Sequence, residues 1–592
     1  MHNPEFVRVG FTSTFVSRWS VTALAVSLLL ASARAQPPKA RSHATQPEFG
    51  DNVLLFDPSM PAANIQSQID KVYSIQQHSE FGSARYALLF LPGEYHVDIP
   101  VGFYTQVLGL GASPDAVHII GNVHSDASLP RNNATCTFWR GVEGFSITPT
   151  DGTMQWAVSQ AAPFRRMHVI GNIVLHQKGG WASGGWMSDS LIDGKVGAGP
   201  QQQWISRNSE WGSWSGANWN MVFVGIPHPP QGEWPQPPYT KVDKTPIVRE
   251  KPFLWVDAKG NWNVRVPEIR KDSTGITWHG GTTPGKDIAL SKFYIAKPGD
   301  TAATINAQLA KGMHLLLTPG TYELDAQIRV ARPGSVVLGL GFPTLKPTRG
   351  TAALSVGDRE GIVVAGVLID AGETKSPVLM SVGDGFSGVL HSNPISLHDV
   401  FFRVGGSGVG KAGINLEVMA NSVIIDHTWI WRADHGKGVG WDQNLSNIGL
   451  MVNGDDVTAY GLFVEHHQRF QVLWNGNGGR TYFYQSEIPY DPPDQPSFTS
   501  APRTNGWASY KVADNVTTHE AWGLGIYSVF RHPNVTLTRA IEVPVTPGVR
   551  FHHMITVALD NLGEISNVID NKGGPTHVAP NRVTPKVADF PQ

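Results

Sequence analysis

The chain has 592 residues, more than one hydrophobic core usually organises, so two or more domains are expected. A formal net charge of −2 argues against a nucleic acid or an anionic membrane as partner. Glycine (63 residues) and proline (42) are abundant and only 16% of residues are charged, which favours many turns over long helices. The single cysteine, Cys136, excludes an internal disulfide.

Residues 1–35 are predicted to be a secretory signal peptide. Arg8 and Arg18 supply the positive charge, VTALAVSLLLASARA is the apolar run, and residues 33–35 (Ala-Arg-Ala) form a small-x-small cleavage site. The apolar core has about a dozen residues, whereas a membrane-spanning helix needs roughly 20. We therefore expect a mature chain that begins at Gln36, is secreted to the extracellular or periplasmic space, and is not held in a membrane.

Two stretches of the chain repeat one pattern. Residues 88–111 read LLFLPGEYHVDIPVGFYTQVLGLG, and residues 315–341 read LLLTPGTYELDAQIRVARPGSVVLGLG. Each contains a buried-strand run, Pro-Gly-x-Tyr, a short strand and Val-Leu-Gly-Leu-Gly. Each also follows a helix-like stretch, which begins at Ala62 or Ala302. Four repeated elements at a separation of 227 residues predict two similar domains in tandem.

The second copy contains short apolar runs separated by turns. Equating the centres of five runs gives coils of 24 to 33 residues; the centres are Val367, Val400, Trp429, Leu462 and Ser486. Coils of this length with short strands fit a right-handed parallel β-helix, in which stacked coils bury one another's inner faces. An array of β-sandwiches is the competing fold, but it favours longer alternating strands and regular hairpins. The sequence therefore predicts an all-β chain with two tandem parallel β-helices.

The proposed domain boundaries follow from this repeat. Residues 36–226 are assigned to the first β-helix and residues 290–592 to the second. Residues 227–289 are assigned to a connector with a hairpin, because GIPHPPQGEWPQPPYTKVDKTP is rich in proline.

Tryptophans gather in one 39-residue stretch of the first domain. Flat rings with a polar edge suit stacking on the C–H faces of sugars. Glycine and small polar residues surround them in GGWASGGWMSDS and SEWGSWSGANWN, which favours a ligand surface, although core packing is the alternative. The candidate substrate-binding tryptophans here are Trp181, Trp186, Trp204 and Trp219.

A second candidate cluster is VEHHQRFQVLWNGNGG, residues 464–479. Its side chains offer many hydrogen-bond donors and acceptors, which sugar hydroxyls need, although a hydrated turn is the alternative. With its neighbours downstream, it supplies the remaining candidate substrate-binding residues, His466, His467, Gln468, Trp474, Gln485 and Tyr490.

Glu487 stands among aromatic residues in GRTYFYQSEIPYDPP. In the coil alignment it takes the place of apolar residues in earlier coils, Leu368, Phe401, Ile430 and Phe463. A carboxyl group at such a position is costly to desolvate, and desolvation raises its pKa toward that of a general acid. A structural carboxylate bonded to a neighbouring turn is the alternative.

These motifs together resemble glycoside hydrolase family 55. The most specific match is WNGNGGRTYFYQSEIPYDPP, supported by GGWASGGWMSDS, QQQWISRNS and the paired Pro-Gly-x-Tyr openings. The resemblance implies a secreted β-1,3-glucanase, exo-acting and inverting, on pectate-lyase-like β-helices. It also implies a general acid from the second domain, for which Glu487 is the matching position. The attacking water would be held by polar side chains of the first domain, for which the candidates are Gln177, Gln203 and Ser206.

The mechanism expected from this resemblance needs neither a metal nor another cofactor. The non-reducing end of a β-glucan enters a groove between the domains, and Glu487 protonates the glycosidic oxygen. Glu465 is the second candidate, either as the acid or as the like charge that tunes Glu487. We expect a monomer, because a tandem pair can form its own cleft.

Two other functions stay open. A β-helix polysaccharide lyase would need a basic groove, and only Arg432, Arg469 and Arg480 lie near the key motifs. A non-catalytic glycan-binding protein or adhesin would keep the tryptophans but would have no use for a desolvated glutamate. The fold does not separate these functions.

Overall fold

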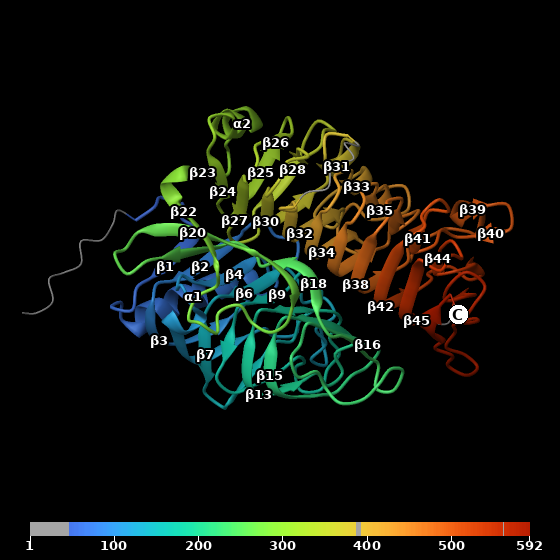
Figure 1. Ribbon diagram of the computed structural model, residues 1–592, viewed down its shortest axis with the longest axis horizontal. Helices are drawn as coiled ribbons and strands as arrows, with labels where there is room; N and C mark the ends of the chain where they lie inside the picture. Colours follow the sequence, from blue (N-terminus) through green and yellow to red (C-terminus); the bar gives the residue numbers. More distant parts are fainter. Residues whose placement is uncertain (1–45, 386–391, 561, 592) are drawn as a thin grey trace, which may run out of the picture. The chain divides into compact units, whose positions relative to one another are not determined.

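Two stacks of mostly parallel strands make up the chain, and a helix follows the first strand of each stack (Figure 1). The structure is a computed structural model that describes residues 46–385, 392–560 and 562–591, so the predicted signal peptide lies outside the described residues. The helices are α1 (Ala62–Gln76) and α2 (Ala302–Ala310), both at the positions predicted from sequence. The Thr301 hydroxyl caps α2 by accepting a hydrogen bond from the amide of Thr304.

The first β-helix consists of two parallel sheets. The first sheet contains, in order of pairing, β1 (Val53–Phe56), β2 (Tyr86–Phe90), β4 (Thr105–Gly109), β6 (Arg140–Glu143), β9 (Pro163–Arg165), β12 (Trp186–Ser188), β14 (Gln203–Arg207), β16 (Asn220–Val224) and β17 (Tyr239–Val242). The second sheet contains β3 (Gly93–Pro100), β5 (Val117–His124), β7 (Ser146–Pro149), β10 (His168–Val169), β13 (Leu191–Gly197), β11 (Asn172–Val174), β8 (Thr153–Gln155) and β15 (Glu210–Ser215). A short 3-10 helix, η1 (Pro114–Ala116), precedes β5.

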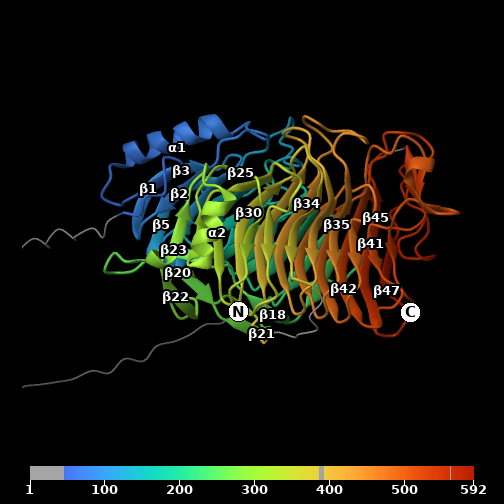
Figure 2. The ribbon, with the colours of Figure 1, turned by 90° about the horizontal axis from the view of Figure 1, so that it is seen from above.

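The second β-helix repeats this plan, and in Figure 2 its strands follow one another as successive rungs. Its larger sheet contains β23 (Phe293–Ala296), β24 (His314–Leu317), β27 (Val336–Gly339), β30 (Val363–Asp370), β32 (Ser396–Val404), β34 (Ile424–Arg432), β36 (Thr458–Glu465), β38 (Gly479–Glu487), β42 (His519–Ser528), β45 (Val549–Ala558) and β47 (Lys586–Phe590), with β25 (Thr321–Leu324) and β28 (Thr344–Pro347) alongside. Its smaller sheet contains β26 (Ile328–Val330), β29 (Leu354–Val356), β31 (Ser376–Val382), β33 (Ala412–Val418), β35 (Ser446–Val452), β37 (Val472–Trp474), β41 (Tyr510–Val512) and β44 (Ile541–Glu542).

The remaining elements are short. The segment between the β-helices pairs β18 (Thr245–Arg249) with β21 (Ile269–Ser273), and joins β19 (Phe253–Val256), β20 (Trp262–Pro267) and β22 (Gly285–Ala289). The 3-10 helix η2 (Leu290–Lys292) follows it, and η3 (Pro496–Phe498) lies near the pairs β39 (Thr499–Ala501) with β40 (Thr504–Asn505) and β43 (Val535–Leu537) with β46 (Gly563–Ile565).

The prediction of an all-β chain with two tandem parallel β-helices is confirmed. Because β17 pairs with β16, the first sheet continues past residue 226, where the sequence analysis placed the start of the connector. Among the described residues there is no helix with the length and apolar character needed to span a membrane.

Each β-helix has a core of its own, and a third apolar cluster joins them. Rings on the outer face of the first large sheet, such as Trp186, pack against rings on the outer face of the second, such as Trp429, Tyr460 and Phe463. The two large sheets therefore face each other, so that side chains pointing out of one β-helix are buried by the other.

A left-handed residue interrupts each long strand of the second large sheet at the same register position. These residues are Gly366, Asp399, His427, Gly461, Phe483, Gly523 and His553, with φ between 49° and 71°. In β38, Tyr482 and Phe483 both lie in the cluster between the β-helices, whereas Tyr484 returns to the inner core. The pairing register is the same on both sides of each left-handed residue, so each is a kink shared by all the strands, and it resets the in-and-out alternation of the side chains.

The strand pairing corrects the coil alignment drawn from the sequence. Glu487 pairs with Glu465, and Glu465 pairs with Trp431, so the predicted equivalence of Glu487 with Phe463 and Ile430 is wrong. The left-handed residue in each strand lets apolar side chains occupy both inward and outward positions, so matching apolar runs does not fix the register. Glu487 points out of its own β-helix, toward the junction.

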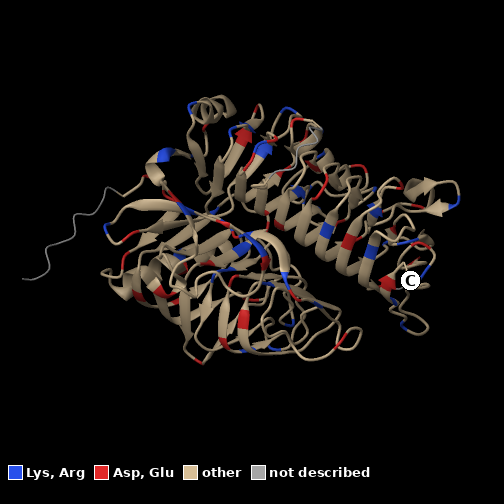
Figure 3. Cartoon of the chain, viewed as in Figure 1, with Lys and Arg blue, Asp and Glu red and all other residues tan. Residues whose placement is uncertain are grey.

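Buried charges also cross the junction between the two β-helices. Arg165 of β9 bonds Asp399 (2.9 Å) and Asp426 (2.8 Å) of the second β-helix, and Arg207 of β14 bonds Asp426 (3.0 Å). All four side chains are at most 3% exposed. Burial acts to raise the pKa of Asp426, but the two guanidinium groups hold that pKa well below its usual range. Figure 3 shows basic and acidic residues interspersed along both β-helices.

Asp426→Asn should destabilise the protein by about 3–5 kcal/mol, because two buried guanidinium groups lose their shared carboxylate. Chemical denaturation at neutral pH measures this change. The matched control is Asp287→Asn, which breaks a surface pair with Arg265 (2.6 Å) and should cost no more than about 1 kcal/mol. Equal losses from both variants would contradict the role assigned to the buried network.

Candidate active site

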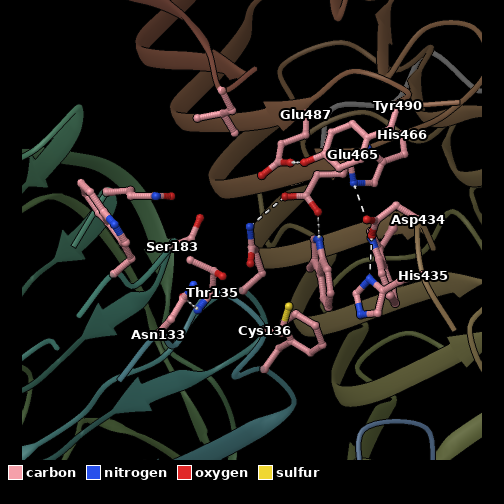
Figure 4. A pocket seen from close by; sticks show the side chains of 17 residues that line it. Asn133, Thr135, Cys136, Ser183, Asp434, His435, Glu465, His466, Glu487 and Tyr490 are labelled. Atoms are coloured by element: carbon pink, nitrogen blue, oxygen red, sulfur yellow. Dashed lines mark hydrogen bonds and ion pairs between the residues drawn. The ribbon is translucent and has the colours of Figure 1, made fainter. Parts of the chain in front are cut away.

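A pocket of about 300 Å³ lies where the two β-helices meet (Figure 4). The first β-helix contributes polar side chains to one wall, including Asn133, Thr135, Gln160 and Ser183. The second contributes the carboxylic acids Asp434, Glu465 and Glu487 to the other. The pocket therefore faces polar donors and acceptors on one side and acids on the other.

Glu465 and Glu487 are the last residues of the neighbouring strands β36 and β38 and pair in register. Parallel strands run about 4.8 Å apart, so the two carboxyl groups project side by side into the pocket. Glu465 is 3% exposed, whereas Glu487 keeps partial contact with solvent. This pairing follows directly from the length and register of the two strands.

The two carboxyl groups have different hydrogen-bond partners. Gln160 Nε2 donates to one oxygen of Glu465 (2.8 Å) and Trp429 Nε1 donates to the other (2.8 Å). The Tyr490 hydroxyl donates to one oxygen of Glu487. Two N–H donors favour an ionised Glu465, while Glu487 keeps an oxygen that can carry a proton.

Both pKa values are raised, for related reasons. Burial raises the pKa of Glu487 well above its usual range, and the nearby charges of Glu465 and Asp434 raise it further. Burial raises the pKa of Glu465 to about 7, an increase that its hydrogen bond from Trp429 opposes. Because two adjacent carboxyl groups do not readily both ionise, the pair holds a proton at neutral pH, and Glu487 is its preferred position.

Asp434 lies beside this pair and stays ionised. Burial acts to raise its pKa, but the hydrogen bond with His435 (2.9 Å) and the charges of His466, His435 and Arg531 hold that pKa at about 2. The other ring nitrogen of His435 lies 2.6 Å from Glu80. Bonds to the two carboxylates outweigh the effect of burial and raise the pKa of His435 to about 10.

Several of the predicted residues meet in this pocket. Its lining includes Glu487, Glu465, His466, Tyr490 and Trp181. The His466 ring lies edge-on to Tyr490 at 4.3 Å. Several of the residues singled out by the motif around Glu487 therefore line one pocket.

An aromatic surface extends the pocket. Trp181 is 49% exposed, and its ring is stacked on that of Trp219, with ring centres 6.4 Å apart. Trp219 in turn lies 5.3 Å from Tyr527, the strand neighbour of Glu487. Trp181 lines the pocket and Trp219 packs beside it, so both stay candidates for stacking on a sugar.

The three residues predicted to hold water lie outside the pocket. Ser206 is fully buried inside the first β-helix, where its hydroxyl accepts from Trp204 Nε1 (3.2 Å). Gln177 bonds the backbone amide of Ala127 and so orders a neighbouring loop. Gln203 lies behind the lining residue Ser183, to which its amide donates (3.4 Å). We therefore replace these candidates with the residues of the same domain that do line the pocket.

Three of the tryptophans predicted to bind substrate are instead packed inside the protein. Trp186, Trp204 and Trp474 are fully buried, Trp186 between the β-helices and the other two inside them. The glycines near them serve close packing, since a Cβ on Gly185 would lie 2.0 Å from the Trp204 ring. The prediction that these rings bind substrate is wrong, because they have no exposed face.

The remaining polar candidates also lie outside the pocket lining. His467 is fully buried and bonds Ser446 (2.8 Å) and the carbonyl of Ile430 (3.2 Å). Gln468 donates to the carbonyl of Trp441 (2.7 Å), which fixes the turn after β36. Gln485 is fully buried and neither polar atom of its amide has a hydrogen-bond partner among the described residues, but the amide lies close enough to Glu465 to oppose the rise in the pKa of Glu465.

The sequence analysis missed four functional candidates, Gln160, Ser183, Asp434 and His435. Ser183 stands within GGWASGGWMSDS, which had been singled out for its tryptophans. Asp434 and His435 lie just after the end of β34, and the pair Glu465-His466 lies at the end of β36. The repeated succession of an acid and a histidine is the sequence signal that could have found them. Gln160 gives no sequence signal of its own.

Comparisons with known proteins agree with this geometry. A family model described as the LAM55 pectate lyase-like domain matches residues 293–487. A curated exo-β-1,3-glucanase from Streptomyces sp. (strain SirexAA-E / ActE) is 46% identical over 583 residues, which cover 96% of each chain.

Solved structures give the same result. That of sacteLam55A from Streptomyces sp. SirexAA-E has a TM-score of 0.90 and 48% identity, covering 92% of this chain and 99% of that one. A variant of sacteLam55A in complex with glucose, at 47% identity, has the same TM-score and coverage.

Glu465→Gln should lower the pKa of Glu487, because the substitution removes a neighbouring negative charge that favours the protonated form. Carbon-13 NMR of side-chain carboxyl groups in glutamate-labelled protein measures this pKa directly, with Glu487→Gln to assign the signal. Glu417→Gln is the control, because Glu417 of β33 is also partly buried with a raised pKa but lies outside the pocket. An unchanged Glu487 titration in Glu465→Gln would contradict the proposed coupling.

Proposed function

The chain belongs to glycoside hydrolase family 55, and on that premise we propose that it removes glucose from the non-reducing end of β-1,3-glucan with inversion of configuration. It is a glycoside hydrolase carried on a β-helix scaffold. The observation that carries the proposal is the pair Glu465 and Glu487, two adjacent carboxyl groups in unequal environments at the junction pocket.

Glu487 is the proposed general acid. Its raised pKa keeps it protonated near neutral pH, and its partial exposure lets it reach a glycosidic oxygen in the pocket. The proton passes to that oxygen as the bond to the anomeric carbon breaks, so the remaining glucan leaves as an alcohol. Tyr490 donates to the other oxygen and orients the carboxyl group.

The attacking water is proposed to lie near Glu465, Gln160 and Ser183. Glu465 and Glu487 project from the same face of one sheet, so they do not flank the anomeric carbon from opposite sides. The opposite wall of the pocket carries Gln160 and Ser183, and Gln160 is bonded to Glu465. A water held by Gln160 and Ser183 on this wall attacks the anomeric carbon from the face opposite the glycosidic oxygen that Glu487 protonates; this attack inverts the configuration, and the proton of the water passes to solvent.

The shape of the pocket supports action at a chain end. Trp429 and Trp431 stack on each other (4.9 Å) and press against Phe138, so rigid rings form one wall. Asp434 and His435 line the pocket beside this wall. A pocket lined by acidic residues and aromatic rings can receive the terminal sugar of a glucan chain. The rest of the glucan chain would then lie along Trp181 and Trp219.

The alternative functions receive less support. Among the described residues that line the pocket, Asp434, Glu465 and Glu487 are acidic and none is Lys or Arg. A lyase acting on an acidic polysaccharide needs cationic groups there, and a purely binding protein has no need for a protonated glutamate.

We also propose that the protein is secreted and acts as a monomer, with no membrane or nucleic acid partner. Secretion is supported by the sequence features of residues 1–35. The monomer is supported by the pocket, because its described lining comes from both β-helices of a single chain.

Glu487→Gln should reduce kcat on laminarin by at least ~100-fold, the lower end of what a general acid contributes. Proton NMR of the wild-type reaction should show glucose released as the α-anomer. Asp456→Asn is the matched control, because Asp456 lies in a surface turn 3.8 Å from Arg480. Full activity of Glu487→Gln would refute its assignment as the acid, and initial release of the β-anomer would refute inversion.

Trp181→Ala should raise KM for laminarin about tenfold or less with a smaller change in kcat, because one stacked ring contributes about 0.5–1.5 kcal/mol. Steady-state kinetics on laminarin and on laminaribiose measure this, and the effect should be larger for the longer chain. Trp255→Ala is the control, because Trp255 bonds Asp287 on the connector sheet. An equal effect on both substrates would place Trp181 outside the binding surface for the leaving chain.

A further inference from the structure

Three different metal-binding side chains converge beside the pocket. Glu80 follows α1, Cys136 precedes β6 and His435 follows β34, so they come from three distant segments. Their ligand atoms all lie within 4.8 Å of one another, and each side chain is partly accessible. Cys136 and His435 also line the pocket itself.

The imidazole of His435 is already held as metal-binding histidines are held. Its Nδ1 is bonded to Asp434 (2.9 Å), which leaves Nε2 directed at Glu80 (2.6 Å). The ring is fixed between Phe81 (5.6 Å) and Trp431 (5.3 Å). A carboxylate on the second ring nitrogen is the usual outer-shell partner of a metal-bound histidine.

The donor set selects a class of ion. Thiolate sulfur and imidazole nitrogen favour Zn²⁺ or Cd²⁺, whereas Mg²⁺ and Ca²⁺ prefer oxygen ligands. Three protein ligands leave a fourth tetrahedral position for water. Coordination would release the thiol proton of Cys136 and the Nε2 proton of His435 to solvent.

We propose that Glu80, Cys136 and His435 form a binding site for a soft divalent cation, Zn²⁺ or Cd²⁺, and that an ion bound there inhibits the enzyme. The inhibition, unlike the binding, rests on the proposed glucanase function. An ion at this position occupies space at the wall beside Asp434 and adds positive charge close to the groups that receive the terminal sugar. Inhibition is therefore expected to be reversible on chelation.

Binding is tested on the mature protein without any substrate. Titration with Cd²⁺ should produce thiolate-to-metal charge-transfer absorption with one equivalent bound, and calorimetry should detect Zn²⁺. Cys136→Ser should abolish the absorption, and Glu80→Gln should weaken binding by at least about tenfold. His168→Asn is the matched control, because His168 also lies between two carboxylates, Asp115 (2.6 Å) and Asp193 (3.1 Å), but on the outer face of the first β-helix. Absent absorption in the wild type, or equal absorption in Cys136→Ser, would overturn the site.

Inhibition is tested with laminarin, comparing each variant with its own metal-free rate. Zn²⁺ should inhibit wild type and His168→Asn alike, with recovery on addition of EDTA, whereas Cys136→Ser and Glu80→Gln should need at least about tenfold more metal. Binding without any effect on an active enzyme would overturn the inhibitory role alone. A wild type inert on laminarin would instead refute the proposed function, and the absorption titration would still decide the metal site.

Discussion

The face-to-face contact of the two large sheets is the constraint on which the site depends. A β-helix alone points half of each strand's side chains outward, and in this protein the other β-helix buries those side chains. Arg165 and Arg207 of the first β-helix reach Asp399 and Asp426 of the second through a layer of packed rings. Buried ion pairs tolerate little displacement, because a separated charge has no water to replace its partner. The network therefore fixes the position of one β-helix against the other.

The geometry of the candidate active site depends on this fixed position of the two β-helices. Glu465 belongs to the second β-helix, but one of its two N–H donors is Gln160 of the first. The two domains thus build the pocket together: one provides the carboxyl groups, and the other provides the amide that bonds Glu465. A relative shift of the domains would remove this donor and alter the pKa values on which the chemistry depends.

The sequence predicted the fold well, but it marked only some of the residues that line the pocket, for physical reasons. The Pro-Gly-x-Tyr repeat and the short apolar runs reflect coil stacking, which is a local pattern, so the two β-helices could be predicted. The register could not, because the left-handed residue in each strand, such as His427 or Phe483, has no consistent residue type. Glycines near Trp204 indicated close packing of the ring on the backbone rather than a sugar surface. Gln160 acts across the junction, and a contact between residues 305 positions apart has no signature in a single sequence.

The residues that stack in register with Glu487 on successive strands include both a stabilising ion pair and the pair of acids in the pocket. Successive strands place Asp370, Arg403, Trp431, Glu465 and Glu487 at one register position. Stacking forces neighbours to within a strand spacing, so adjacent charges must either attract or repel. Asp370 and Arg403 form a buried ion pair (2.7 Å), whereas Glu465 and Glu487 repel unless one is protonated. The repulsion does not stabilise the fold. It favours the protonated form of Glu487 beside a solvent-accessible pocket, and a general acid must be protonated at the working pH.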